Sequence, residues 1–252
     1  MKTASFQDLA TCLTSEQPPR VWSLLVTVFG ELAQQEGARI SGTLLGQLTT
    51  LMGVKPEAMR VALHRLRKDG WIESERDGRK SSYHLTQWGR AQSAKATPRI
   101  YGLADVNAPA VLAICNGTLA GSTAPQGEVW ITSNIVITTD PARYEDAFCT
   151  QLRPDDLPDW MRGKTVSHAT QEQASSLLGQ LNAMTPNADR LSNLEIAALR
   201  ILIVHGWRRI VLRTPPLPDF VFPRQWAGPA CRARVATLLT QLPAQTLAGL
   251  ET

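Results

Sequence analysis

The side chains with the clearest chemical potential lie on one face of a predicted helix, Pro56 to Lys68. Apolar residues recur there at steps of three and four, which predicts a buried stripe formed by Met59, Ala62, Leu63 and Leu66. At about 100° per residue, the opposite face carries Glu57, Arg60, Val61, His64 and Lys68, with Arg65 and Arg67 on its flanks. Guanidinium and ammonium groups bind phosphates and the edges of bases. This helix is therefore expected to contact nucleic acid.

A helix about 12 Å across fits the major groove of duplex DNA, where its outward face meets bases and phosphates. Arg60 is expected to read guanine through O6 and N7, a contact that discriminates by about 1–3 kcal/mol. Lys68 and the flanking arginines are expected to contact phosphates, which fixes the register without reading sequence. His64 has two interpretations: a donor to DNA, or an ordinary surface histidine.

A basic hairpin is predicted directly after this helix. Residues 71–75 alternate as a strand, and residues 83–85 form its returning partner. Asp77-Gly78 between them is a strong turn signal, because type I′ turns need positive φ at both central residues. The basic residues near the tip are Arg76, Arg79 and Lys80. Such a hairpin is typical of a wing that lies along phosphates or enters a minor groove.

The distribution of charge also favours a local contact with a polyanion. Nine Lys or Arg and five Asp or Glu lie between Gly53 and Arg90, so this window carries the whole net charge of +4. A uniformly basic protein would spread the excess along the chain. The alternative interpretation is an ordinary solvated helix face. The residues predicted to contact DNA are Lys55, Glu57, Arg60, Val61, His64, Arg65, Lys68, Arg76, Arg79 and Lys80.

The elements that would hold the basic helix precede it in the chain. A helix is predicted from Val21, and its apolar pattern stops at Glu36-Gly37. A short extended piece over residues 39–41 leads to a second helix, Thr43 to Met52. Gly53 is expected to take positive φ at the end of that helix. The order of helix, helix, basic helix and basic hairpin predicts a winged helix-turn-helix domain.

Two blocks of the sequence resemble the PaaX-type regulators. The N-terminal block comprises Ser23-Leu24-Leu25 to Phe29-Gly30, residues 59–66, Gly70-Trp71-Ile72, and residues 78–86 followed by Gly89. The second block comprises Gly206-Trp207-Arg208-Arg209, Pro216-Leu217-Pro218, Pro223 and Trp226-Ala227-Gly228. Two blocks in the same order are more specific than either block alone.

The resemblance implies a repressor of phenylacetate catabolism genes with an α+β fold. Its parts would be a GntR-like winged helix-turn-helix domain (18–94), a ferredoxin-like, Cas2-like α/β domain (98–169) and a C-terminal helical domain (170–252). The last of these commonly contributes to dimerisation, and a homodimer suits a palindromic operator. The expected effector is an aryl-CoA thioester such as phenylacetyl-CoA, which would relieve repression. The segment from Ala108 to Gly121 departs from the family, because it is small and apolar where a charged helix is expected.

Local patterns predict the elements outside the DNA-binding part. Residues 95–98 are predicted to be a linker, and Pro141 to Phe148 a helix with proline in its first turn. Adjacent strands are predicted at residues 129–131 and 135–137. The last third is predicted to be helical, with helices from a capping box at Thr170 to Gln173, from Ser192, over 229–242 and over 244–250.

An enzyme is the less favoured class of protein. The chain has no G-x-S-x-G sequence, no phosphate-binding glycine loop and no metal-ligand spacing, so no catalytic residue, metal or cofactor is predicted. The alternative function is a metal-independent nucleic-acid-binding module or nuclease-like protein built on the central domain. In that domain Asp105 is the single candidate for a catalytic carboxylate. Tryptophans could stack on single-stranded bases. Trp22, Trp71 and Trp88 flank apolar stripes, however, and are expected to anchor the core.

Composition places the chain among ordinary globular proteins, with 43% hydrophobic and 19% charged residues. No apolar run approaches the roughly 20 residues that cross a bilayer, and no secretory signal is evident, so a cytoplasmic location is expected. The four scattered cysteines are expected to be reduced and mostly buried. The effector site stays unknown, and its basic candidates are Arg153, Arg162, Lys164, Arg208, Arg209 and Arg213.

Overall fold

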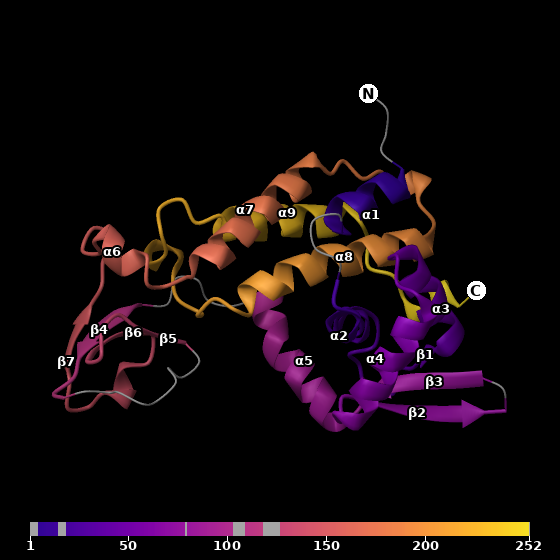
Figure 1. The fold of residues 1–252 in the computed structure, drawn as a ribbon, viewed down its shortest axis with the longest axis horizontal. Coiled ribbons are helices and arrows are strands. Elements are labelled where there is room, and N and C mark those ends of the chain that lie inside the picture. Colours follow the sequence, from indigo (N-terminus) through magenta and orange to yellow (C-terminus); the bar gives the residue numbers. More distant parts are fainter. Residues whose placement is uncertain (1–4, 15–18, 79, 103–108, 118–126, 252) are drawn as a thin grey trace.

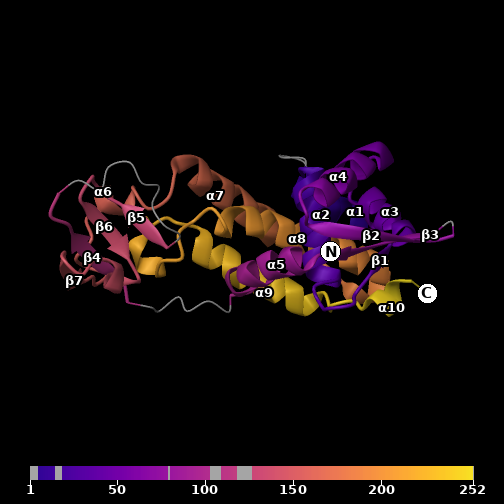
Figure 2. The same ribbon diagram turned by 90° about the horizontal axis from the view of Figure 1, so that it is seen from below.

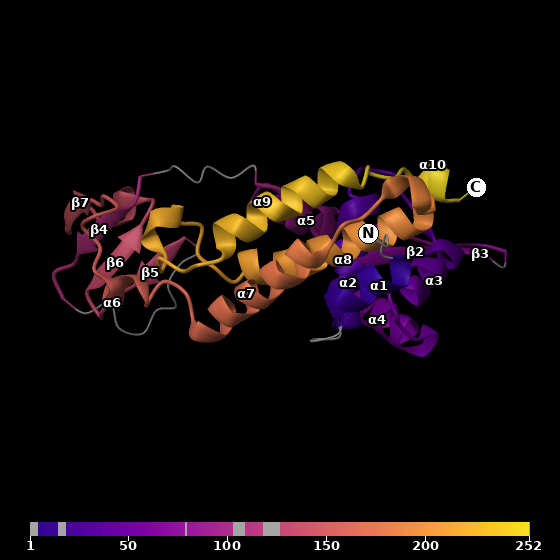
Figure 3. The same cartoon turned by 90° about the horizontal axis from the view of Figure 1, so that it is seen from above.

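The computed structural model describes residues 5–14, 19–78, 80–102, 109–117 and 127–251, which form a mixed helical and sheet architecture. The chain is elongated, with a four-stranded sheet at one end and a two-stranded hairpin at the other (Figure 1). Two further views give the same arrangement (Figures 2 and 3). A long helix, α8 (Asn193–Val211), runs between the two ends. No described helix is both long and apolar enough to span a lipid bilayer.

The N-terminal part contains the predicted elements. They are preceded by a helix, α1, that was not predicted from the sequence. The helices are α1 (Phe6–Thr14), α2 (Val21–Leu32), α3 (Gly42–Leu51), α4 (Pro56–Lys68) and α5 (Gln87–Ile100). The strands are β1 (Ile40–Ser41), β2 (Ile72–Asp77) and β3 (Lys80–Leu85), in the antiparallel order β1-β3-β2. The positive φ predicted for Gly53 is confirmed at +76°.

The hairpin turn begins one residue later than the Asp77-Gly78 signal predicts. Asp77 pairs with Lys80 across the ladder, so both belong to the strands and Gly78 is the described residue of the turn. Pairing between β2 and β3 continues to the tip of the hairpin, so Asp77 is the last residue of β2. Gly78 has a φ of +58°, a left-handed conformation that glycine adopts without steric cost. Arg79, predicted to lie at the tip, falls outside the described residues.

The four-stranded sheet lies in the central part of the chain. Its strands are β4 (Val111–Ile114), β5 (Glu128–Trp130), β6 (Ile135–Thr138) and β7 (Phe148–Gln151). Their order is β5-β6-β4-β7, and all neighbours are antiparallel. The adjacent strands predicted around 129–131 and 135–137 are confirmed as β5 and β6. Among the residues described in its connections there is no α-helix, so the ferredoxin-like assignment stays a prediction.

The remaining elements are helices and 3-10 turns, of which α7, α9 and α10 pack against α8. They are α6 (Asp159–Arg162), α7 (His168–Ala183), α9 (Gly228–Gln241), α10 (Leu247–Leu250) and the 3-10 turns η1 (Pro141–Arg143), η2 (Ala188–Arg190) and η3 (Asp219–Val221). Helix α8 contacts α1, α2, α3, α5, α7, α9 and α10. Its residues Ile201 to Val204 are all buried, which is typical of a helix enclosed on every side.

Buried apolar side chains form two clusters. The larger joins the N-terminal helices to the C-terminal helices and includes Leu24, Phe29, Leu199 and Trp207. Within it, the indole Nε1 of Trp207 donates a 2.9 Å hydrogen bond to the carbonyl of Ile100 at the end of α5. The smaller cluster lies against the four-stranded sheet and includes Leu217, Val221 and Phe222 from the connection between α8 and α9. The C-terminal part therefore packs in both clusters.

The predicted linker at residues 95–98 is wrong, because these residues belong to α5. Pro98 lies in the last turn, where its missing N–H removes a single helical hydrogen bond. Tertiary contacts hold this turn in place. Thr97 Oγ1 accepts a 3.1 Å hydrogen bond from Gln34 Nε2, and the guanidinium of Arg99 donates to the carbonyls of Val211 and Thr214.

The helix predicted from Pro141 to Phe148 is also wrong. Only the single 3-10 turn η1 forms, and Phe148 opens strand β7, where it pairs with Ile114 of β4. A side-chain contact fixes the segment between them: the hydroxyl of Tyr144 donates a 2.5 Å hydrogen bond to the carboxylate of Glu128, which is buried. Pairing with β4 thus satisfies the backbone groups from Phe148 onward, and local turn hydrogen bonds hold Arg143, Tyr144 and Ala147.

The cap of α7 and the burial of the cysteines need smaller corrections. The N-cap is Ser167, whose Oγ accepts from the Thr170 amide at 3.3 Å, so α7 starts before the capping box predicted at Thr170. Serine is a stronger N-cap residue than threonine, and Ser167 precedes Thr170 in the chain. The helix start predicted at Ser192 is confirmed, and the structure adds a capping box there with Glu195 as the partner of Ser192. Of the four cysteines only Cys231 is buried, so the expectation of mostly buried thiols is wrong.

Candidate nucleic-acid interface

Helix α4 is set by strong local signals at both ends. Pro56 occupies its first turn and Glu57 lies beside it, where a carboxylate interacts favourably with the helix dipole. Arg65, Arg67 and Lys68 lie in the last turn, where cations are favoured. The helix ends at Lys68 and the chain turns away through Asp69 and Gly70, which has a φ of +73°. These features keep the basic residues on a regular helix.

Burial along α4 follows the predicted pattern. Ala62, Leu63 and Leu66 are buried, and Met59 is half-buried against α3. The residues of the outward face are all exposed: Glu57, Arg60, Val61, His64, Arg65, Arg67 and Lys68. Lys55, Arg76 and Lys80, which were also predicted to contact DNA, are exposed as well. The positively charged side of α4 therefore faces away from the rest of the chain, as the sequence predicts.

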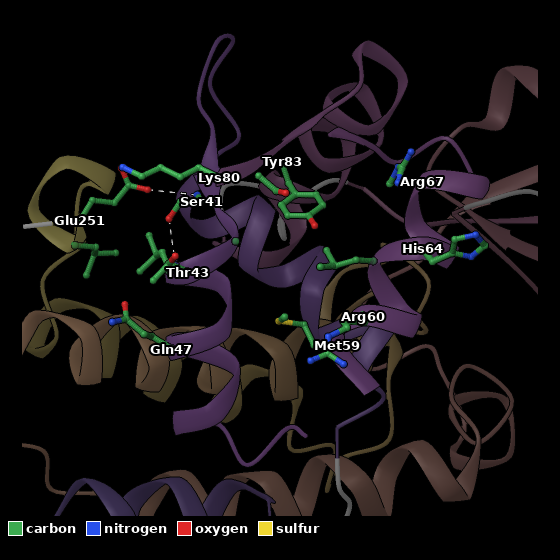
Figure 4. A pocket seen from close by; sticks show the side chains of 15 residues that line it. Ser41, Thr43, Gln47, Met59, Arg60, His64, Arg67, Lys80, Tyr83 and Glu251 are labelled. Atoms are coloured by element: carbon green, nitrogen blue, oxygen red, sulfur yellow. Dashed lines mark hydrogen bonds between the residues drawn. The ribbon is translucent and has the colours of Figure 1, made fainter. Parts of the chain in front are cut away.

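A hollow of about 880 Å³ lies between α3, α4 and β3 (Figure 4). The basic and imidazole groups that line it are those of Arg60, His64, Arg67 and Lys80. The sequence reading missed the polar residues on the other side of this hollow, which are Ser41, Thr43, Gln47 and Tyr83. The one local signal for them is Ser41, a good N-cap residue directly before α3. The hollow thus combines groups from β1, α3, α4 and β3, together with the end of the short C-terminal helix α10.

The other predicted contact residues lie around this hollow. Lys68 lines a second hollow of about 760 Å³, between α4 and β2, together with His64 and Arg67. Lys55, Glu57, Val61 and Arg65 lie on α4 or directly before it but line neither hollow. The structure therefore places some of the predicted residues in the two hollows, and the other described ones on the exposed surface of α4, directly before it or on the hairpin.

The ion pairs on α4 are exposed. Arg60 Nη1 lies 3.9 Å from Glu57 Oε1, and Arg65 Nε lies 3.6 Å from Asp69 Oδ2. Exposed pairs of this kind stabilise by well under about 1 kcal/mol. Their guanidinium groups can therefore exchange these carboxylates for phosphates at little cost.

Two of the three acidic residues of β2, Glu75 and Glu73, have cationic or imidazole partners of their own. Glu75 accepts a hydrogen bond from the guanidinium of Arg39, and this bond lowers the pKa of the Glu75 carboxyl. His84 Nε2 lies 3.3 Å from Glu73 Oε2. The contact with Arg39 reduces the negative field that the strand presents beside α4.

Three tryptophans join α2, the hairpin and α5. The ring centroids of Trp22 and Trp71 are 5.7 Å apart, and those of Trp71 and Trp88 are 5.1 Å apart, both with edge-to-face geometry. Trp22 and Trp71 pack against the large core, as predicted. Trp88 is 49% exposed, so its assignment to the core is wrong. The guanidinium of Arg65 lies 5.9 Å from the Trp22 ring, which couples the basic face to this cluster.

Gly89 makes the close packing of α5 against the hairpin possible. A Cβ at this position would lie 2.3 Å from the carbonyl oxygen of Trp71. That oxygen accepts the Thr86 amide at 3.0 Å, and Thr86 Oγ1 caps α5 by accepting from the Gly89 amide at 2.9 Å. Any larger residue would push α5 away from the base of the hairpin.

The basic residues considered for an effector are dispersed. Arg162 is buried and donates to main-chain carbonyls, and Arg208 donates to the Ser23 carbonyl at 3.1 Å, so both hold the fold together. Arg209 lines a hollow of about 280 Å³ between α7 and α8. The exposed candidates are Arg153, Lys164 and Arg213. Asp105, the carboxylate of the nuclease alternative, lies outside the described residues.

Comparison with known proteins gives matches in two regions of the chain. The family model for PaaX-like proteins matches residues 20–89, which include α2, α3, α4 and the hairpin. The model for the PaaX-like protein C-terminal domain matches residues 166–249, which include α7, α8 and α9. The chain is also 25% identical over 249 residues to the transcriptional repressor PaaX of Escherichia coli (strain K12). That similarity covers 83% of this chain and 76% of the relative.

Proposed function

The chain belongs to the PaaX-like family, and from this premise we propose that it is a transcriptional repressor that binds double-stranded operator DNA through α4 and the β2–β3 hairpin. One observation carries the proposal: the residues that hold the whole net charge of the chain surround a helix whose basic side is exposed. The similar protein of Escherichia coli bears the name of a transcriptional repressor. A repressor with such a surface needs no catalytic site.

In this proposal α4 lies in the major groove with its outward face against the bases. Arg60 projects from the middle of that face and would pair with O6 and N7 of a guanine. Arg65, Arg67 and Lys68 lie at the end of the helix, where they would meet phosphates on one strand. Lys55 and His64 extend this contact along α4. Arg60 would thus read the base sequence, whereas the residues that contact phosphates would fix the position of α4 on the duplex.

The hairpin in this proposal is the wing. Lys80 and Arg76 lie near its tip and are exposed, so they would follow the phosphates beside the groove that α4 occupies. Arg79 is assigned to the same surface by its place in the sequence. Two copies bound to a palindrome would repeat these contacts about one helical turn apart.

The direct test is a binding experiment on the DNA upstream of the protein's own gene. Fluorescence anisotropy is measured over a series of salt concentrations, with random duplex for comparison. Affinity is expected to fall steeply with salt, because each neutralised phosphate contributes about −0.9 to the slope of log K against log salt. Arg60→Ala is expected to reduce the preference for operator over random DNA, and Lys68→Ala to weaken both by similar factors.

A matched control removes an exposed arginine far from α4. Arg224 lies after η3 and pairs with Asp159 of α6 at 3.6 Å, beside the four-stranded sheet. Arg224→Ala changes the net charge by the same amount as Arg60→Ala. If both substitutions reduce operator binding equally, a nonspecific charge effect explains the data and the proposed interface is wrong.

The family resemblance extends the proposal to an effector and a dimer. The repressor would act on genes of aromatic acid catabolism, as a cytoplasmic homodimer that an aryl-CoA thioester such as phenylacetyl-CoA controls. Thermal denaturation with a panel of CoA thioesters tests the effector, because a bound ligand raises the midpoint by mass action. Light scattering coupled to gel filtration tests the dimer. Identical midpoints with free CoA and every thioester would rule out the effector class.

A further inference from the structure

The DNA-facing hollow contains a carboxylate from a distant part of the chain. The main-chain N–H of Ser41 donates a 3.3 Å hydrogen bond to Oε1 of Glu251, and 210 residues separate the two. Glu251 lines the same hollow as Arg60, His64, Arg67 and Lys80. In Figure 4 the Lys80 side chain extends toward Glu251 above the start of α3. An acidic group therefore lies among cations in the region proposed to receive DNA.

The start of α3 explains why a carboxylate is bound there. Ser41 is the N-cap, and its Oγ accepts from the Leu44 amide at 3.2 Å. In a capping box the third helical residue is Glu or Gln and binds the N-cap N–H. That arrangement exists in α8, where the Ser192 amide donates to Glu195 at 2.8 Å. In α3 the corresponding residue is Leu44, so the Ser41 amide finds its acceptor in Glu251.

Helix α10 delivers Glu251 to this position. Thr246 caps α10, and the apolar residues Leu247 and Leu250 pack against the large core. The carbonyl of Gly249 accepts a 3.4 Å hydrogen bond from the Asn193 side chain at the start of α8. These contacts hold the end of α10 beside α3, so the approach of Glu251 to Ser41 is supported by packing on both sides.

From these contacts we infer that the start of α3 is a phosphate site of the DNA interface, and that Glu251 occupies it in the free protein. A helix N-terminus binds carboxylate and phosphate through the same amide groups and the same positive dipole end. Ser41, Thr43 and Lys80 would then contact one backbone phosphate of the duplex, and Glu251 must leave before that phosphate can enter. The DNA part of this inference rests on the proposed function; the competition between anions does not.

The first experiment uses inorganic phosphate as the probe and requires no DNA. Amide signals of residues 41–44 are followed by ¹H–¹⁵N NMR during a phosphate titration of the full-length protein. Glu251→Gln is expected to bind phosphate about two- to fivefold more tightly than the wild type, since an anionic competitor at a helix N-terminus has been neutralised. Glu145→Gln is the matched control, because Glu145 is exposed in the connection before β7 and its loss changes net charge equally.

The second experiment measures operator affinity of the same three proteins by anisotropy. Glu251→Gln is expected to bind about two- to fivefold more tightly than Glu145→Gln at low salt. If the phosphate titration separates the two variants but none of the proteins binds DNA, the anion site stands and the proposed function fails. If Glu251→Gln and Glu145→Gln behave alike with phosphate and with DNA, Glu251 is a structural cap only and the inference is overturned.

Discussion

Glu31 of α2 and Arg200 of α8 form a buried ion pair, with 3.2 Å between Glu31 Oε2 and Arg200 Nε and side chains only 7% and 12% exposed. The hydroxyl of Tyr101, directly after α5, donates to the same carboxylate. Arg200 Nη1 also donates to the carbonyl of Leu239 in α9 at 2.9 Å. One ion pair thus joins the helices that carry the DNA-facing surface to the C-terminal helices.

We predict that Arg200→Leu lowers the free energy of unfolding by about 3–5 kcal/mol, because it leaves the buried Glu31 carboxylate without its cation. Denaturation in urea, followed by far-UV circular dichroism, measures the change. The double variant Glu31→Leu with Arg200→Leu is expected to lose less than the sum of the two single losses, since no unpaired charge remains. Additive losses would show that the two side chains do not interact.

Stability is predicted to depend on the protonation of His205. The ring is 3% exposed, and its Nδ1 lies 3.2 Å from Thr27 Oγ1. Burial, together with the positive charges of Arg209 and Arg208, lowers the pKa of His205 from 6.5 to about 3. Between these two values the unfolded chain binds the proton more readily than the folded chain. The stabilisation is therefore complete above about pH 6.5 and decreases as the pH falls toward 3.

On this basis the free energy of unfolding attributable to His205 falls by about 2 kcal/mol between pH 7 and pH 5. His205→Gln is expected to remove that part of the pH dependence. The control is His168→Gln, because His168 is exposed at the start of α7. Urea midpoints at both pH values give the comparison, and an unchanged pH slope in His205→Gln would contradict the assignment.

Val61 is predicted to contact a thymine methyl group. Its side chain is 70% exposed on the outward face of α4, and an apolar contact with the C5 methyl is one way in which proteins read thymine in the major groove. Replacing the contacted thymine by deoxyuridine is expected to weaken wild-type binding about fivefold, in line with the loss of about one buried methyl group. Val61→Ala is expected to show a smaller difference between the two duplexes, because the alanine methyl group makes less apolar contact, and Val61→Thr is expected to be intermediate. Equal sensitivity of wild type and Val61→Ala would refute the contact.

Arg162 is predicted to be irreplaceable by lysine. It is 5% exposed and donates to the carbonyls of Leu157 at 3.1 Å and Phe222 at 3.3 Å, and also to those of Pro154 and Phe220. A planar guanidinium can serve these carbonyls together, whereas a lysine ammonium cannot match that geometry. Arg162→Lys is expected to lower stability by about 3 kcal/mol or more. Thermal unfolding tests this, with the exposed Arg224→Lys as control; similar midpoints for the two variants would count against it.

The sequence predicted those parts of the fold that short-range patterns determine. The apolar stripe and Pro56 defined helix α4, and Ser192 marked the start of α8. The exposed basic face followed from the same periodicity, because the burial of one side of a helix leaves the other side to solvent. The missed helix α1 carried a weaker signal of this kind: Phe6, Leu9 and Ala10 are its buried residues.

Local patterns failed where distant contacts outweighed them. Residues 95–98 contain a proline, yet hydrogen bonds from Gln34 and from Arg99 hold them in α5. Pro141 resembles the start of a helix, yet pairing with β4 makes Phe148 part of a strand. In each case the local preference amounts to about 1–3 kcal/mol, which a few tertiary contacts can exceed.

The sequence alone therefore determined which residues lie on the outward face of α4 and that this face is basic, because helical periodicity and charge are properties of neighbouring residues. Only the tertiary structure placed Ser41 beside Glu251 and Glu31 beside Arg200. Packing of the helices around α8 brings these residues together from opposite ends of the chain. No local pattern encodes such a meeting, since it depends on the relative placement of whole helices.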